Sequence, residues 1–314
     1  MNYSKRHIAL LVTLAASIPA VVLFDAQISH GQTPAAGKSS TQTESRVKPT
    51  SIVRERRAGV GTSDHSAAAS FAEAATRNAF LRTELYWIFG GKQQRGWNLY
   101  LPLIQRLLNT NQQTGANGFA LALARWQEKS GLQPSGVLDE ESWYAMVSAW
   151  QGARLKIRDY PAADQLITAP SSDFYDPSRP DELRQVEREA YAAYKRMISA
   201  AAADPSVGLA RGVDAQLAPT ELYFKIISPF RTREYQEKLR RESPHAGRAG
   251  LAINSPHFTG RALDIYVGGD PVDTRDSNRA LQVQTRAYQW LVRNAERFGF
   301  RPYYYEPWHW EYVR

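Results

Sequence analysis

Apolar residues recur with the period of an α-helix between Phe71 and Gln151, and this pattern predicts a unit of three or four helices. The last helix has the clearest beginning, because Asp139 suits the N-cap position and two glutamates follow it in the first turn. The apolar positions that define the helices are Phe71, Ala74, Ala75 and Leu81, then Ile104, Leu107 and Leu108, then Phe119, Leu123 and Trp126, and finally Trp143, Met146, Val147 and Trp150.

The chain after residue 181 mixes helical periods with the short apolar runs that are typical of strands. Helices are predicted over 183–203 and 233–242, strands over 222–228 and 262–267, and a strand at the C-terminal end. Another helix is expected to be capped by Asp276 or Ser277 and to end at Gly299; its predicted inward side chains are Leu281, Leu291, Val292, Ala295 and Phe298. Because these elements lack a βαβ rhythm, the predicted fold class is α+β with a small antiparallel sheet, preceded by an N-terminal all-α domain.

Composition divides the chain into five segments. Lys5 and Arg6 precede an apolar run over residues 8–24, so residues 1–31 are predicted to be a signal peptide or membrane anchor, with removal favoured over retention as a membrane tether. Residues 32–66 are predicted to be a disordered tether, because they are rich in small and polar residues. The helical domain then covers 67–152, a linker 153–181 and the C-terminal domain 182–314. The protein is therefore expected to be exported to the periplasm or cell envelope.

The charge and the cysteine content limit the kinds of functional site and partner that this chain of 314 residues can have. It has no cysteine, which excludes disulfides, thiolate zinc sites and cysteine nucleophiles, and leaves any metal to histidine and carboxylate ligands. Its formal net charge of +8 favours anionic surroundings such as an acidic wall polymer. Nucleic acid is not an expected partner, because the basic residues are not interleaved with aromatic ones along one face. The sequence gives no indication of the oligomeric state.

The stretch SPHFTGRALD at 255–264 places a histidine shortly before a strand that carries a carboxylate. In the strand ALDIYV, Asp264 shares a face with Ala262, while the alternate residues form an apolar face. Gly260 permits a tight reversal that would bring His257 back over Asp264. Alone this spacing is weak, since a helix cap, a turn histidine or a salt bridge to Arg261 explains it equally well.

A second stretch, EPWHW at 306–310, adds a histidine and another carboxylate. Glu306 and His309 are three residues apart, so they face the same side only if the chain bends between them, and Pro307 is suited to that bend. Two histidines and one carboxylate with an open fourth position form a catalytic zinc site, in which Glu306 remains free to act as a general base. A non-haem iron triad is the alternative, but its His-x-Asp spacing is absent. His245 is a rival ligand.

These two stretches resemble the signatures of the VanY-type zinc D-alanyl-D-alanine carboxypeptidases. Residues 255–264 match S-x-H-x-x-G-x-A-x-D, and residues 306–309 match E-x-W-H. The similarity spans about residues 183–313 and includes SPFRTREYQ at 228–236, which is similar to the family's S-x-Y-R-S segment. The resemblance implies a hedgehog and D,D-peptidase-like fold and substrates that are peptidoglycan stem peptides, from which the terminal D-alanine is removed.

The resemblance also implies roles for individual residues. His257, Asp264 and His309 become ligands of Zn²⁺, and Glu306 becomes the general base. Arg231 becomes the cation that stabilises the tetrahedral intermediate, and the resemblance makes two further residues possible substrate contacts, Ser255 and Gln236. The sequence departs from the family pattern in two places, which bear on the identity of the scissile bond. Phe230 replaces the family's usual tyrosine, and the hairpin that usually precedes E-P-W-H is missing.

The helical domain carries a second resemblance. Residues 124–147, ARWQEKSGLQPSGVLDEESWYAMV, are similar to the last two helices of the three-helix peptidoglycan-binding domain. This implies binding of wall glycan, and a purely structural copy of the domain is the alternative. For the whole chain, the alternatives to a D,D-carboxypeptidase are an L,D-carboxypeptidase or endopeptidase of the same zinc type, and a wall-binding protein without turnover.

Overall fold

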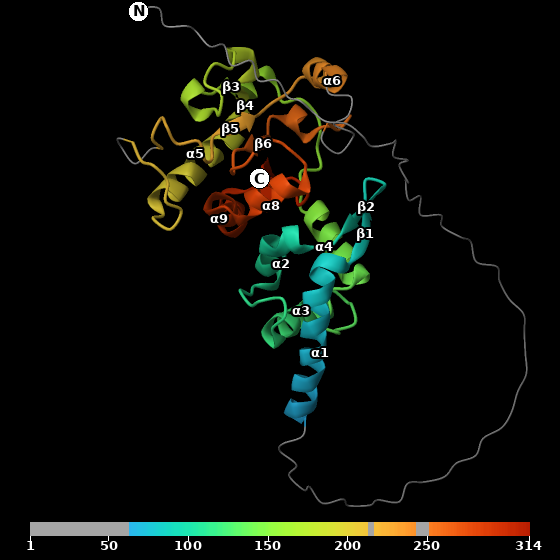
Figure 1. The fold of residues 1–314 in the computed structure, drawn as a ribbon. Coiled ribbons are helices and arrows are strands. Elements are labelled where there is room, and N and C mark those ends of the chain that lie inside the picture. The colour runs from blue at the N-terminus through green and yellow to red at the C-terminus, as the bar shows by residue number, and fades with distance from the viewer. Residues whose placement is uncertain (1–62, 213–216, 243–250) are drawn as a thin grey trace, which may run out of the picture.

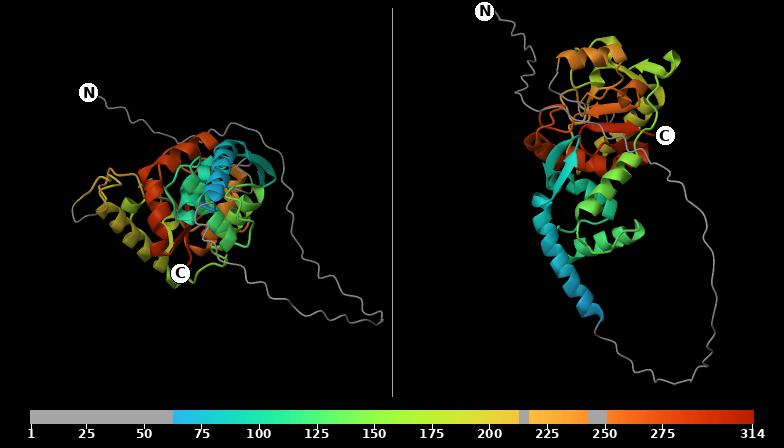
Figure 2. Two further views of the ribbon diagram at one scale, coloured as in Figure 1. Left: turned by 90° about the horizontal axis from the view of Figure 1, so that it is seen from below. Right: turned by 90° about the vertical axis from the view of Figure 1, so that its right-hand side faces the viewer.

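The computed structural model describes residues 63–212, 217–242 and 251–314, so the expected leader and most of the expected tether lie outside the described residues. Two parts are visible: a helical unit up to about residue 153, and a C-terminal part that contains the main sheet (Figure 1). Two further views show the same two parts in direct contact, with α1 extending away from the C-terminal part (Figure 2). In the part of the chain that is described, no helix combines the length and apolar character needed to cross a membrane.

The helical unit contains the four helices that the apolar period predicts. They are α1 (Ser63–Glu84), α2 (Leu101–Leu108), α3 (Asn117–Lys129) and α4 (Glu140–Gly152), and η1 (Asn98–Tyr100) leads into α2. The predicted cap of α4 is confirmed, because the Asp139 side chain accepts a hydrogen bond of 2.9 Å from the Ser142 backbone N–H. Such a cap satisfies one of the otherwise unpaired donors of the first turn.

The expectation of an all-α N-terminal domain is wrong between residues 86 and 95. Strands β1 (Tyr86–Phe89) and β2 (Lys92–Arg95) form an antiparallel hairpin there. Gly90 and Gly91 form its two-residue turn with φ angles of 57° and 75°, the left-handed values that a tight hairpin turn requires. Trp87 is buried on the inward side of β1, so the hairpin contributes to the core.

The C-terminal part has a four-stranded antiparallel sheet, in agreement with the predicted α+β class. Its order is β5 (Ile226–Ser228), β6 (Ala262–Ile265), β8 (His309–Tyr312) and β7 (Phe300–Pro302). A separate pair, β3 (Leu166–Thr168) and β4 (Gln185–Glu187), joins the segment expected to be a linker to the C-terminal part. The helices are α5 (Arg188–Ala203), α6 (Arg233–Glu242), α8 (Asp276–Gln284) and α9 (Arg286–Asn294), and the short 3₁₀ turns include η6 (Pro256–Thr259) and η7 (Ala295–Phe298).

The single helix predicted from residue 276 to Gly299 is instead two helices and a 3₁₀ turn. Thr285 is extended between α8 and α9, and its side chain caps α9 by accepting from the Tyr288 N–H. Because the chain changes direction there, Leu281 is 62% exposed rather than inward. The N-cap of α8 is Arg275 rather than Asp276 or Ser277, while the predicted end at Gly299 is confirmed by its left-handed φ of 90°. Helix 183–203 begins later, at Arg188, because residues 185–187 form β4.

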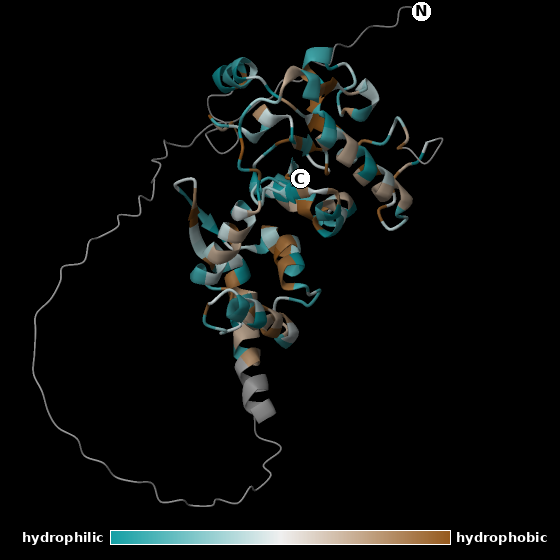
Figure 3. Ribbon diagram, turned by 180° about the vertical axis from the view of Figure 1, so that it is seen from behind, coloured by the Kyte–Doolittle hydropathy of each residue, from teal (hydrophilic) through white to brown (hydrophobic). Residues whose placement is uncertain are grey.

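The two parts share an aromatic contact centred on Tyr304, which is only 2% exposed. Its ring lies 5.5 Å from Phe89, 5.6 Å from Tyr100 and 6.0 Å from Trp150, measured between centroids. Figure 3 shows that α2, between the two parts, is strongly apolar, whereas α6 at the outer surface is hydrophilic. Most of the buried apolar residues of both parts form one continuous core, and a small separate cluster lies between α1 and α3.

We expect Asn78→Ala to lower the free energy of unfolding by about 2 to 4 kcal/mol, because two buried backbone groups lose their partner. The Asn78 amide donates to the Gly136 carbonyl at 2.8 Å and accepts from the Leu138 N–H at 2.7 Å. Urea unfolding followed by circular dichroism measures the change. Arg77→Ala, on the exposed side of the same helix, is the control, and its free energy of unfolding should stay within about 0.5 kcal/mol of wild type. Equal losses in both variants would contradict the contacts of Asn78 with the loop at residues 136–138.

Candidate metal centre and peptidase site

The centre of the site is formed by the pairing of two neighbouring strands. Asp264 of β6 lies directly opposite His309 of β8 in the antiparallel register. Asp264 Oδ1 is 2.9 Å from His309 Nδ1, and the two residues are 2% and 4% exposed. Both faces of β6 are buried, so the face that carries Asp264 is closed to bulk solvent as well. The sheet therefore brings together two residues that are 45 positions apart.

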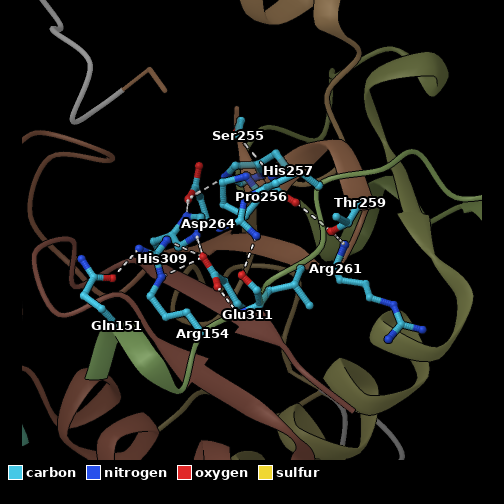
Figure 4. A network of polar contacts seen from close by, with 12 residues as sticks. Gln151, Arg154, Ser255, Pro256, His257, Thr259, Arg261, Asp264, His309 and Glu311 are labelled. Carbon is cyan, nitrogen blue, oxygen red and sulfur yellow. Dashed lines mark hydrogen bonds and ion pairs between the residues drawn. The ribbon is translucent and has the colours of Figure 1, made fainter. Parts of the chain in front are cut away.

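His257 joins this pair from the turn that precedes β6. Ser255 caps η6, since its hydroxyl accepts from the His257 N–H at 3.3 Å, and Gly260 ends the turn with a φ of 66°. This is the reversal that the glycine was expected to allow. His257 Nε2 lies 3.3 Å from Asp264 Oδ1, and the two imidazole centroids are 4.9 Å apart. Figure 4 shows the two imidazoles and the Asp264 carboxylate pointing toward one another.

The residues fit a divalent metal ion. One ligand atom from each of His257, Asp264 and His309 can be chosen so that all three lie within 4.8 Å of one another. His257 Nδ1 is 2.7 Å from the Pro229 carbonyl and His309 Nε2 is 3.1 Å from Glu311 Oε1, so each imidazole has an acceptor on its outer nitrogen. An outer nitrogen that donates leaves the lone pair of the inner nitrogen toward Asp264, which is the tautomer that a metal ligand needs.

Glu306 lies in the turn between β7 and β8. Its backbone N–H donates to the Tyr303 carbonyl at 3.1 Å, and its own carbonyl accepts from the His309 N–H at 3.0 Å, so the chain bends at Pro307 as expected. The side chain is 7% exposed. Burial raises the pKa of Glu306 to about 7, against the opposing influence of His309. A carboxyl group with that pKa can take up and release a proton near neutral pH.

Arg231 contacts the centre directly. Its Nη2 lies 2.5 Å from Asp264 Oδ2, its Nε donates to Ser228 Oγ at 2.8 Å, and its Nη1 lies 3.3 Å from Gln236 Oε1. Burial alone would raise the pKa of Asp264, but His257 and Arg231 outweigh it and hold that pKa well below its usual value. Burial and the charge of Arg231 together lower the pKa of His257 to about 4.

Ser255 and Gln236 are buried, with partners inside the protein. The Ser255 hydroxyl caps η6, and the Gln236 amide donates to the Ala252 carbonyl at 3.1 Å while its oxygen faces Arg231. Substrate contacts by these two residues stay a prediction. The rival ligand His245 lies outside the described residues.

Glu311, which contacts the outer nitrogen of His309, was not among the predicted site residues. It is completely buried, and its carboxylate contacts His309 Nε2, the Arg154 guanidinium and the Leu155 N–H. Burial lowers the pKa of His309, but Asp264 and Glu311 outweigh it and raise that pKa to about 9. The strand period of two places Glu311 on the same face as His309 and could have identified it. Arg154 is 157 positions away and carries no local signal.

A sequence model of the VanY family, described as D-alanyl-D-alanine carboxypeptidase, matches residues 183–314. The match includes the main sheet, both histidines, Asp264, Glu306 and Arg231, and it leaves out the helical unit. Among proteins with curated descriptions, none is similar enough to this chain to count as a match.

We expect Gly260→Ala to destabilise the protein more than Gly90→Ala, although both glycines have positive φ angles. A Cβ at Gly260 would lie 2.9 Å from the Glu187 backbone nitrogen, whereas a Cβ at Gly90 would have no neighbour within 4 Å. Gly90→Ala should cost about 1 to 2 kcal/mol for the left-handed conformation alone, and Gly260→Ala should cost more. Urea unfolding of both variants measures the difference; a smaller loss for Gly260→Ala would show that the turn before β6 is not held against β4.

Proposed function

We propose that this chain is an exported zinc peptidase that removes the terminal D-alanine from peptidoglycan stem peptides, because residues 183–314 match the sequence model of the VanY family of D-alanyl-D-alanine carboxypeptidases. The observation that carries the proposal is the buried group of His257, Asp264 and His309, whose ligand atoms lie within 4.8 Å of one another. Two imidazoles and one carboxylate are the donor set of catalytic zinc sites, which keep a further position open.

The three ligands would be His257 through Nε2, Asp264 through its carboxylate and His309 through Nδ1. Pro229 and Glu311 support these choices, because each holds the outer nitrogen of one imidazole. When bound, zinc would lower the pKa of a water molecule and polarise the carbonyl group of the scissile bond.

Glu306 is the general base of the proposed reaction. Its carboxylate takes a proton from the attacking water as the water oxygen bonds to the carbonyl carbon, and it delivers that proton to the nitrogen of the departing D-alanine as the C–N bond breaks. The raised pKa of Glu306, about 7, supports both transfers. A carboxylate at the usual pKa would be a weaker base and would take the proton from water less readily.

Arg231 has two roles in the proposed reaction. Its Nη2 keeps Asp264 ionised through their 2.5 Å contact. Its Nη1, whose contact with Gln236 is the longest of the three at 3.3 Å, is the donor that we assign to the oxyanion of the tetrahedral intermediate. Gln236 would turn toward the peptide when Nη1 does, and Ser255 would hold the turn that carries His257.

The location of the reaction follows from the basic leader and the apolar run at residues 8–24, which we propose direct export to the periplasm or cell envelope. The helical unit would lie against wall glycan. Its resemblance to peptidoglycan-binding domains supports this role, as does the net charge of +8, which favours an anionic wall.

The test is mass spectrometry of pentapeptide muropeptides incubated with the zinc-loaded full chain. We expect the loss of a single alanine with wild type, and a rate about 10² to 10⁴ times lower with Glu306→Ala, since a general base contributes about that factor. Zinc content should be unchanged in this variant, because Glu306 is not among the three ligands. Glu237→Ala, an exposed glutamate on α6, is the matched control and should retain the wild-type rate.

Other products would indicate a different peptidase activity. Cleavage inside the stem would indicate an endopeptidase, and cleavage of tetrapeptides in place of pentapeptides would indicate an L,D-carboxypeptidase of the same zinc type. Unchanged peptides with the zinc-loaded wild type would contradict a peptidase function and favour a wall-binding protein. Full activity in Glu306→Ala would show that another group is the base.

A further inference from the structure

Glu311 is a fully buried carboxylate with four donors around it. Arg154 reaches Glu311 Oε1 through Nε at 3.0 Å and Nη2 at 2.5 Å, the Leu155 N–H donates to Oε2 at 2.9 Å, and His309 Nε2 lies 3.1 Å from Oε1. Figure 4 shows Arg154 and His309 converging on the same carboxylate. Three of these four contacts come from the segment that directly follows α4. That segment lies outside residues 183–314, so the VanY match does not include it.

Arg154 is fixed in this position by both parts of the protein. Its Nη1 donates to Gln151 Oε1 at 2.8 Å, and its guanidinium lies over the Tyr303 ring, 3.9 Å from the centroid. One turn earlier in α4, Trp150 stacks on Tyr304. The aromatic contact between the parts thus holds the end of α4, and with it the backbone that carries Arg154, against the residues that precede Glu306.

Arg154 is a cation that lies directly against the buried carboxylate of Glu311. A buried carboxylate without a cation is costly and tends to take up a proton. Glu311 has such a cation, because Arg154 Nη2 lies 2.5 Å from Glu311 Oε1. An ionised carboxylate is a strong acceptor for the imidazole N–H, and it both orients the ring and makes the other nitrogen a better metal ligand. A protonated carboxyl would be a weaker acceptor.

We propose that Arg154 is a positioning residue of the metal centre: acting through Glu311, it orients His309 so that Nδ1 faces Asp264 and His257. The segment that follows α4 therefore contributes to the proposed site as well as packing against it. This inference rests on the proposed function only in taking the bound ion to be zinc. A carboxylate of this kind behind a metal-ligating histidine typically changes metal affinity by about 10- to 100-fold.

The test compares the zinc affinity of the full-length wild type with that of Arg154→Met, by competition against a chromophoric chelator. We expect about 10- to 100-fold weaker binding in Arg154→Met. Arg106→Met is the matched control, because Arg106 of α2 also forms an ion pair across the two parts, but its partner is Glu296, at 3.6 Å, and its side chain is about half exposed. The control should bind zinc within about twofold of wild type, since exposed ion pairs contribute little.

A thermal melt of each metal-free variant separates positioning from packing. If Arg154 serves only the interface, Arg154→Met lowers the melting temperature but leaves the zinc affinity of the folded protein unchanged, and the inference is overturned. If Arg154→Met does not fold, the zinc affinity of Glu311→Gln tests the inference instead, because the amide has the same shape as the carboxylate but no charge. Weaker zinc binding in Glu311→Gln supports the inference, and wild-type affinity overturns it.

The same titration distinguishes failure of the inference from failure of the proposed function. A wild-type chain that binds no zinc contradicts the metal assignment and the inference with it. A wild type that binds zinc and hydrolyses the pentapeptide, together with unchanged zinc affinity in both Arg154→Met and Glu311→Gln, contradicts the inference alone.

Discussion

A carboxylate buried inside a β-sheet must be surrounded by donors and positive charge, and the site around Asp264 is organised by that requirement. Asp264 is 2% exposed and has His257, His309 and Arg231 around its two oxygens. An unpaired carboxylate in this place would cost several kcal/mol. The groups that keep Asp264 ionised come from β8, from the turn before β6 and from the segment after β5. The site is therefore formed only when the sheet is.

The groups that contact the two imidazoles from outside the site must be paired in the same way. The imidazoles have acceptors on their outer nitrogens, Pro229 for His257 and Glu311 for His309. Glu311 is itself a buried charge, and Arg154 supplies the cation that it needs. In this way a continuous series of paired groups runs from the end of α4 to the three residues proposed as metal ligands. Because the family match begins at residue 183, the last members of the series lie outside the matched residues.

Local patterns in the sequence predicted much of this arrangement. The helical period located α2, α3 and α4, and Asp139 could be identified as a cap, since both depend on residues within a few positions of one another. The spacing of His257 and Asp264 alone was a weak signal, and the family resemblance of the two short stretches was needed to group them with His309, which the structure places beside them.

What the sequence did not predict depends on tertiary contacts or on weak local signals. The break at Thr285 interrupts a run whose helical period continues on both sides, so periodicity alone suggested one helix. The β1–β2 hairpin was missed although Gly90 and Gly91 are a recognised turn signal, because the helical pattern on either side dominated. The pairing of Arg154 with Glu311 joins residues 157 positions apart and follows from the docking of the two parts, which no local pattern specifies.

Zinc-edge X-ray absorption on the purified full chain, together with its metal content, tests the central claim most directly. The account predicts one zinc ion per chain, bound by two imidazole nitrogens at about 2.0 to 2.1 Å with oxygen as the remaining ligands. No bound zinc, or a first shell with fewer than two imidazoles, would contradict the assignment of His257, Asp264 and His309 as the metal centre.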